Sequence, residues 1–233
     1  MKVKVLGIPF NISDNDIIPN DIHTYPPEII KMLNNYKGFR NDLCEFLVSN
    51  KCNIVCWHST RLTKLEIADI QKNGISTDDH KGFFESKIKN LPPVITSDVK
   101  QKLLKYIRSI NSSQSEGKVY ASYGIFDLKK DLRNDKIFLK NWGGETIYNY
   151  YEKGFTNDLE LNYIKQELNK ISFPCIVCLR INFSNLIKNN TYFFDDFCNQ
   201  LENFNISEIS GNLCYNRNGF EVVDLLKLNH ITI

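Results

Sequence analysis

The stretch CNIVCWHSTRLTKLEIADIQKNGI, residues 52–75, carries the pattern that decides the fold. It begins with an apolar run rich in strand-forming residues, which predicts a buried β-strand that ends at His58. Thr63 and Glu66 match the Ser/Thr-x-x-Glu capping box, in which two side chains satisfy backbone N–H groups at a helix start. Gly74 marks the helix end, because glycine readily adopts the positive φ of a left-handed cap. The stretch therefore predicts a strand, a polar corner and a capped helix.

Strand and helix patterns alternate along the rest of the chain, without the regular spacing of βαβ units. The helical patterns lie at 28–49, interrupted at Gly38, and 97–110, and the strand patterns lie at 118–126, 173–183 and 218–226. This order predicts an α+β domain with a mostly antiparallel or mixed sheet. We assign residues 51–233 to this domain and expect residues 1–50 to form an N-terminal extension whose helix packs on it.

The composition is typical of a globular protein. The 233 residues are 42% hydrophobic and 24% charged, and the formal net charge is +2. That charge is too small, by itself, to indicate a surface for nucleic acid or membrane. No apolar run is long enough to span a bilayer, and the first residues lack a signal-peptide pattern. The odd number of cysteines, seven, leads us to expect reduced thiols, a cytoplasmic location and no membrane association.

Two cysteine pairs raise the question of a metal site. Cys52 and Cys56 lie close to His58, and Cys175 and Cys178 form a second pair. Both pairs fall inside predicted strands, whereas zinc knuckles are built on glycine-containing turns. Buried cysteine behaves as a small hydrophobic residue. We therefore predict no metal site, and no local signature supports cysteine–histidine catalysis or a glycine-rich phosphate loop.

The segment His58-Ser59-Thr60-Arg61 is the strongest candidate for a binding site. A histidine at a strand end is more often structural than functional. Here the strand is expected to lead into a polar corner, where hydroxyl groups and backbone donors converge near a helix start. That arrangement suits a small polar ligand, and sites tend to lie on loops carried by a rigid scaffold. The residues alone do not decide between a structural histidine and one that binds a ligand.

The same segment resembles a known family. The pattern His58-x-Thr60, with Leu65, Ile70 and Gly74 after it, resembles the first strand and helix of ADP-ribosyltransferase-fold proteins of the His-Tyr-Glu clade. That clade includes poly(ADP-ribose) polymerases and diphtheria-like toxins. The stretches HSTRLTKLEIADIQKNGI, WGGETIYN and PCIV are also similar to stretches of uncharacterised bacterial proteins of this fold. The resemblance covers about residues 54 to 183 and implies a split, mostly antiparallel sheet with flanking helices that takes NAD as its substrate.

The resemblance also implies roles for individual residues. His58 would hydrogen-bond a ribose hydroxyl of NAD, with support from Thr60 or Ser59. The tyrosine of the second motif stacks on nicotinamide, and the strand pattern KVYASYGIF offers Tyr120 and Tyr123. Because these two positions alternate across a strand, only one of them faces any given side. We favour Tyr120, which lies nearer the start of the strand.

The remaining roles fall to Arg61, Trp142 and a glutamate. Arg61 would contact the pyrophosphate, and Trp142, beside a Gly-Gly turn, is a candidate ligand contact or a core aromatic. The glutamate of the clade stabilises the positive charge that develops on the ribose as nicotinamide leaves. Glu145 is supported by its position after the Gly-Gly turn, and Glu221 by its position in a late strand. We favour Glu145 narrowly.

The function implied by the resemblance is an NAD-dependent ADP-ribosyltransferase. It would cleave the nicotinamide–ribose bond and pass ADP-ribose to a protein or nucleic-acid acceptor that the sequence does not identify. Alternatives are an NAD glycohydrolase, an RNA 2′-phosphotransferase-like enzyme and a non-enzymatic nucleotide-sensing module. A place in a bacterial toxin or phage-defence system, with an antitoxin or regulatory partner, rests on association only.

Overall fold

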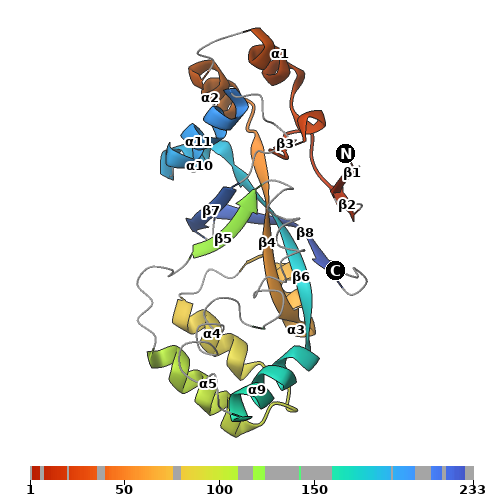
Figure 1. Ribbon diagram of the computed structural model, residues 1–233, viewed down its shortest axis with the longest axis vertical. Coiled ribbons are helices and arrows are strands. Elements are labelled where there is room, and N and C mark those ends of the chain that lie inside the picture. Colours follow the sequence, from red (N-terminus) through yellow and green to blue (C-terminus); the bar gives the residue numbers. More distant parts are fainter. Residues whose placement is uncertain are drawn as a thin grey trace.

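The computed structural model describes residues 2–5, 8–19, 21–35, 40–75, 80–109, 118–123, 142, 159–189, 191–202, 211–216 and 219–228. These residues form an α+β fold around a mixed, mostly antiparallel open sheet, which confirms the predicted class (Figure 1). Glu145, the Gly-Gly turn before it and the last four residues lie outside the described part of the chain. The Tyr120 side chain also lies outside it, although its backbone is part of a strand.

Two long antiparallel strands form the centre of the sheet. β4 (Asn53–Thr63) and β6 (Ser172–Asn182) pair along their entire eleven-residue length. Outside them the order is β7-β5-β4-β6-β8, with β5 at Lys118–Tyr123, β7 at Gly211–Asn216 and β8 at Phe220–Lys227. The short β3 (Asp16–Ile17) runs parallel to the start of β4. A separate hairpin joins β1 (Lys2–Val5) and β2 (Ile8–Asn11).

The course of β4 corrects one sequence prediction. His58 does not end the strand, because β4 continues to Thr63, and His58 lies near its middle. Pairing with β6 extends to Thr63 opposite Ser172, so the predicted polar corner is continuous sheet. Ser59 and Thr60 are buried in it. The strand-to-helix corner lies instead at Thr63 and Lys64.

The two halves of the sheet meet along a short boundary. Among the described residues, β4 and β5 share a single register pair, Trp57 opposite Ser122. All six residues of β5 pair instead with β7 on its other side. β5 therefore diverges from the second half of β4, which stays paired with β6 (Figure 1).

Helices lie at both ends of the elongated molecule (Figure 1). One end carries α1 (Pro27–Asn35), α2 (Arg40–Ser49), α10 (Phe183–Asn189), α11 (Thr191–Glu202) and the short 3-10 helix η1 (Ile22–Thr24). The other end carries α4 (His80–Lys89), α5 (Ser97–Ser109) and α9 (Leu159–Lys170), with α3 (Lys64–Asn73) next to the sheet. The predicted helices at 28–49 and 97–110 are thereby confirmed, the first as two helices. None of the described helices is both long and apolar enough to cross a bilayer.

Separate apolar clusters hold these two ends. The larger one packs one face of the sheet against helices and includes Cys56, Leu62, Val177 and residues of the N-terminal 50 such as Leu43. Because those residues share this core and β3 pairs with β4, the described helices among the first 50 residues pack on the same core as the sheet. A second cluster joins α4, α5 and α9. The boundary at residue 51 stays a prediction.

The helix predicted from the capping box is confirmed at both ends. The Thr63 hydroxyl accepts a hydrogen bond from the Glu66 amide at 3.3 Å, and the Glu66 carboxylate accepts one from the Thr63 amide at 2.7 Å. Gly74 ends α3 with φ 74° and ψ −162°, and its amide donates to the Ile70 carbonyl. This ψ differs from that of a left-handed cap and lies in a region that is open essentially to glycine alone.

We expect Gly74→Ala to destabilise the protein by about 1–3 kcal/mol, because alanine is strained at this φ and ψ. A Cβ at this position would meet no atom within 4 Å, so the cost comes from the backbone and not from a clash. Urea unfolding measures the change. Asn73→Ala, at an exposed neighbour, is the control and should stay within about 0.5 kcal/mol of the wild type. Equal stability of Gly74→Ala and the wild type would contradict the assigned backbone conformation.

Candidate functional site

His58 lies where the two halves of the sheet meet. Alternation along β4 places it on the face of Cys56 and Leu62, which belongs to the larger apolar cluster. It pairs across with Val177 of β6, and it follows Trp57, the residue that pairs with β5. The His58 side chain is partly buried. A titratable group therefore stands in a mostly apolar surface, at the boundary between β4 and β5.

The neighbouring hydroxyl residues divide between the two faces. Thr60 is two residues from His58 and shares its face, whereas Ser59 points to the face of Trp57. Both are less than 10% exposed, at 7% and 9%. Of the two residues proposed to support His58, the fold thus brings Thr60 to the same side.

The two candidate tyrosines are separated in the same way. Tyr123 lies on the face of His58, because its neighbour Ser122 pairs with Trp57. Its hydroxyl donates to Asp196 Oδ2 of α11 at 2.8 Å, and the ring is only 2% exposed. Tyr123 therefore fastens α11 to the sheet. The alternation of β5 assigns the Tyr120 position to the other face, and the stacking role of Tyr120 stays a prediction.

Arg61 is engaged with the end of a helix. Its Nε donates to the Ser172 hydroxyl, and its Nη2 donates to the carbonyls of Asn169 and Ser172, each at 2.9 Å. Asn169 is in the last turn of α9, where carbonyl groups lack partners within the helix. Arg61 thus ties the end of β4 to the start of β6 and to α9. The predicted pyrophosphate contact would have to compete with these bonds.

The capping glutamate is the centre of a buried polar cluster, here called the Glu66 cluster: Thr63, Glu66, Lys87 and Trp142. Besides the Thr63 amide, Glu66 Oε2 accepts a hydrogen bond from Trp142 Nε1 at 2.9 Å. Lys87 Nζ of α4 lies 2.7 Å from Oε1, in an ion pair that lacks the alignment of a good hydrogen bond. The same ammonium lies 5.9 Å from the centroid of a Trp142 ring. One carboxylate therefore joins α3, α4 and the tryptophan.

The electrostatics of the cluster favour the charged carboxylate. Burial by itself raises the pKa of Glu66, but the Lys87 charge and the hydrogen bonds outweigh it and lower the pKa overall. Glu66 and Lys87 are both only 13% exposed at their side chains. Trp142 is 1% exposed and packs in the second apolar cluster, so in the described structure it is a core aromatic.

The sequence predicted only part of the Glu66 cluster. The capping box predicted the Thr63–Glu66 pair, but nothing local indicated that Glu66 would also bind Trp142, 76 positions away. A capping glutamate that is followed by an apolar helix face offers no signal for a lysine partner on another helix. The contact unites the stretch HSTRLTKLE with the first residue of WGGETIYN.

The structure does not bring Glu221 together with His58. Glu221 pairs with Arg180, which pairs with Val55, so Glu221 lies on the opposite face of the sheet from His58. Its side chain is 67% exposed and its carboxylate is 3.4 Å from Arg180 Nε. Arg180 also lies 3.5 Å from the buried Asp16. Glu145, the favoured alternative, lies outside the described residues.

The described cysteines form no disulfides, and all of them except Cys44 are buried. Burial raises the pKa of both Cys52 and Cys175 to about 11, and it also raises the pKa of Cys56. These thiols are protonated at neutral pH and are therefore weak nucleophiles and ligands. Among the described residues, no three histidine, cysteine or acidic side chains are grouped so as to hold a metal ion.

Comparison with protein-family models, with curated proteins and with solved structures returned no match.

We expect Arg61→Lys to lower the free energy of unfolding by roughly 2 kcal/mol, because a lysine cannot replace three charge-assisted donor contacts. The measurement is urea unfolding. Arg40→Lys is the control, since the Arg40–Asp195 ion pair is exposed and its loss should cost less than about 1 kcal/mol. Unchanged stability with weakened NAD binding would show instead that Arg61 contacts the pyrophosphate.

The Glu66 cluster should make the free energy of unfolding depend on pH in the acidic range. Because the pKa of Glu66 is lowered on folding, its contribution is complete above the unfolded value of about 4.3 and is lost as pH falls through the folded value. Glu66→Gln should destabilise the protein by roughly 3 kcal/mol at pH 7, because it removes the carboxylate that neutralises the buried Lys87 ammonium.

Unfolding at pH 7 and near pH 3 measures this dependence. The loss of stability on acidification should be smaller in Glu66→Gln than in the wild type, whereas Glu45→Gln, at an exposed position, should leave it unchanged. The same acid-induced loss in Glu66→Gln and the wild type would contradict a charged Glu66 in the folded state.

Proposed function

We propose that this protein is an NAD-dependent ADP-ribosyltransferase of the His-Tyr-Glu type, built on a split version of its antiparallel sheet. The observation that carries the proposal is the hydrogen bond between Trp142 Nε1 and Glu66. It joins the two stretches on which the family resemblance rests, which are 76 positions apart in the chain. Contact between them is what a shared binding site requires.

The position of His58 supports the same function. It lies beside the single described pair between β4 and β5, from which the two strands diverge, and Thr60 follows on the same face. In the proposed site, His58 binds a ribose hydroxyl of NAD, and Thr60 orients it. The apolar residues around His58, such as Val177, lower the local dielectric and thereby strengthen such a hydrogen bond.

The proposed reaction breaks the bond between the anomeric carbon of the ribose and the pyridine nitrogen. Nicotinamide leaves with the electron pair of that bond, so the ribose becomes positively charged. The Glu145 carboxylate stabilises this charge electrostatically. A nucleophile of the acceptor then bonds to the anomeric carbon and releases its proton. If water takes this place, the reaction is NAD hydrolysis.

The experiment is to follow nicotinamide release from NAD by the full chain. We expect His58→Ala and Glu145→Gln each to lower the rate about 100-fold or more, as for the loss of a group that stabilises the transition state. Glu221→Gln is the matched control, because Glu221 is exposed on the other face of the sheet, and it should retain the wild-type rate.

Circular dichroism establishes that each variant is folded before its rate is compared. Absence of nicotinamide release by the wild type would contradict the enzymatic proposal, and NAD binding without release would favour a nucleotide-sensing module. Loss of activity in Glu221→Gln but not in Glu145→Gln would show that Glu221, and not Glu145, is the catalytic glutamate.

A further inference from the structure

The positive charge of the chain is concentrated in one segment. Residues 80–109 contain seven Lys or Arg residues and only two acidic ones, a surplus of five. The whole chain has a surplus of two, so the remaining residues together carry a deficit of three. This segment forms α4 and α5 and the turn between them. Lys87 is paired with Glu66 of α3, so a surplus of four remains on the two helices and their turn, which the small net charge of the protein conceals.

Both acidic residues of the segment are already neutralised by lysine or arginine. Glu85 of α4 receives two contacts from Arg108 of α5, at 2.8 and 3.1 Å, and lies 3.6 Å from Lys89. Asp98 lies 3.0 Å from Lys102, one turn along α5. Glu85 carries one negative charge against the two positive charges of Arg108 and Lys89, so these three residues together keep a net positive charge.

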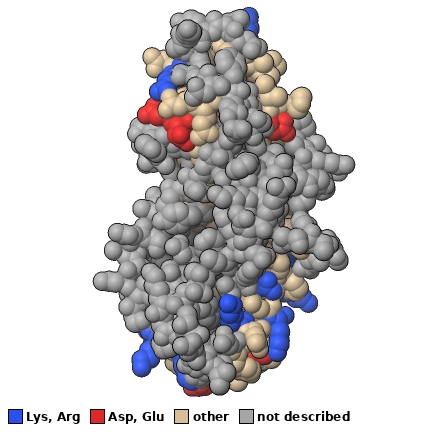
Figure 2. All heavy atoms as spheres, viewed as in Figure 1, with Lys and Arg blue, Asp and Glu red and all other residues tan. Residues whose placement is uncertain are grey.

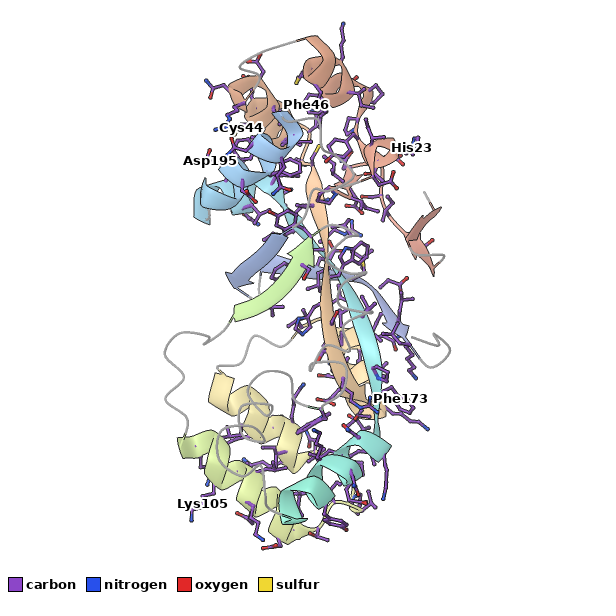
Figure 3. All side chains as sticks on the ribbon, in the orientation of Figure 1. His23, Cys44, Phe46, Lys105, Phe173 and Asp195 are labelled. Atoms are coloured by element: carbon purple, nitrogen blue, oxygen red, sulfur yellow. The ribbon has the colours of Figure 1, made fainter. Side chains whose placement is uncertain are left out.

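The basic side chains are accessible. The exposed fractions of the Lys89, Lys102 and Arg108 side chains are 63%, 40% and 58%. Lys105 is also exposed and forms no ion pair within the described part of the chain. Figure 2 shows a concentration of described Lys and Arg side chains over the lower end of the molecule, and Figure 3 shows Lys105 projecting outward from α5.

The spacing along α5 suits a chain of negative charges. Lys102, Lys105 and Arg108 follow one another at intervals of three residues, which corresponds to a rise of about 4.5 Å each. They therefore form a row on one side of the helix. We call this row together with Lys89 the α4–α5 basic surface.

The described side chains of the surface include no apolar centre of the kind that a protein partner would need. Protein interfaces depend on a few buried aromatic or aliphatic residues surrounded by a polar rim. Among the described side chains of residues 80–109, Val94 is the one large apolar group that is exposed, and it lies in the turn between the helices. Amine and guanidinium groups beside polar residues such as Gln101 are instead typical of contacts to phosphates.

We propose that the α4–α5 basic surface binds the phosphate backbone of nucleic acid. The surface is connected to the Glu66 cluster through α4, which carries both Lys89 of the surface and Lys87 of the cluster. A strand bound along α4 and α5 would therefore lie on the helix that pairs with Glu66. That nucleic acid also accepts ADP-ribose is a further step, and it rests on the proposed function.

The test is binding of a fluorescein-labelled single-stranded 20-nucleotide DNA, followed by anisotropy in the absence of NAD. If about three phosphates are contacted, the dissociation constant should rise roughly twentyfold between 50 and 200 mM salt. Lys89→Glu with Lys105→Glu should weaken binding about tenfold and reduce the salt dependence. The milder Lys89→Gln with Lys105→Gln should do the same to a smaller extent.

The control is Lys31→Glu with Lys51→Glu, which makes the same change of charge at exposed positions outside the basic surface. It should bind as the wild type does. Three results would overturn the proposal. The first is binding that does not depend on salt, and the second is equal weakening by the Lys89→Glu, Lys105→Glu variant and by the control. The third is displacement of the DNA by poly-L-glutamate at equal charge. Because the assay contains no NAD, its outcome is independent of whether the protein cleaves NAD.

Discussion

The pairing of β4 with β6 is the constraint on which the rest of the structure depends. Their eleven residue pairs fix the face of the sheet to which each residue between Asn53 and Thr63 belongs, and its neighbour on β6. The last pair, Thr63 opposite Ser172, brings the start of α3 next to the end of α9, and Arg61 bonds across this junction. His58 is held in the same frame, in the middle of the strand and not at a polar corner after it. A binding site at His58 would therefore be rigid on one side.

The Glu66 carboxylate connects this frame to the helices at one end of the molecule. α3 belongs to the larger apolar cluster through Ile67, whereas Trp142 and Ile88 of α4 belong to the second cluster. Glu66 is the polar link between the two, and its burial is tolerated because the Lys87 ammonium and two N–H donors compensate it. Packing of the two cores is thus linked through one ionised group.

Local patterns predicted local features well. The capping box and the glycine stop depend on neighbours in sequence, and the structure has both. The predicted end of this strand at His58 was wrong, because pairing with β6, more than one hundred residues away, extends β4 through polar residues. The separation of Tyr123 and Glu221 onto opposite faces likewise depends on register, which no single strand reveals. Net charge likewise gave no indication of the basic helices α4 and α5, because a sum over the chain does not show where the charges lie.

The account requires that NAD bind beside His58, where β4 and β5 diverge. The most direct measurement is a crystal structure of the protein soaked with NAD. It should show the dinucleotide next to β4, with a ribose hydroxyl within hydrogen-bond distance of the His58 ring. A dinucleotide bound elsewhere, or a His58 whose two nitrogens bond only to protein groups while NAD is present, would contradict the account.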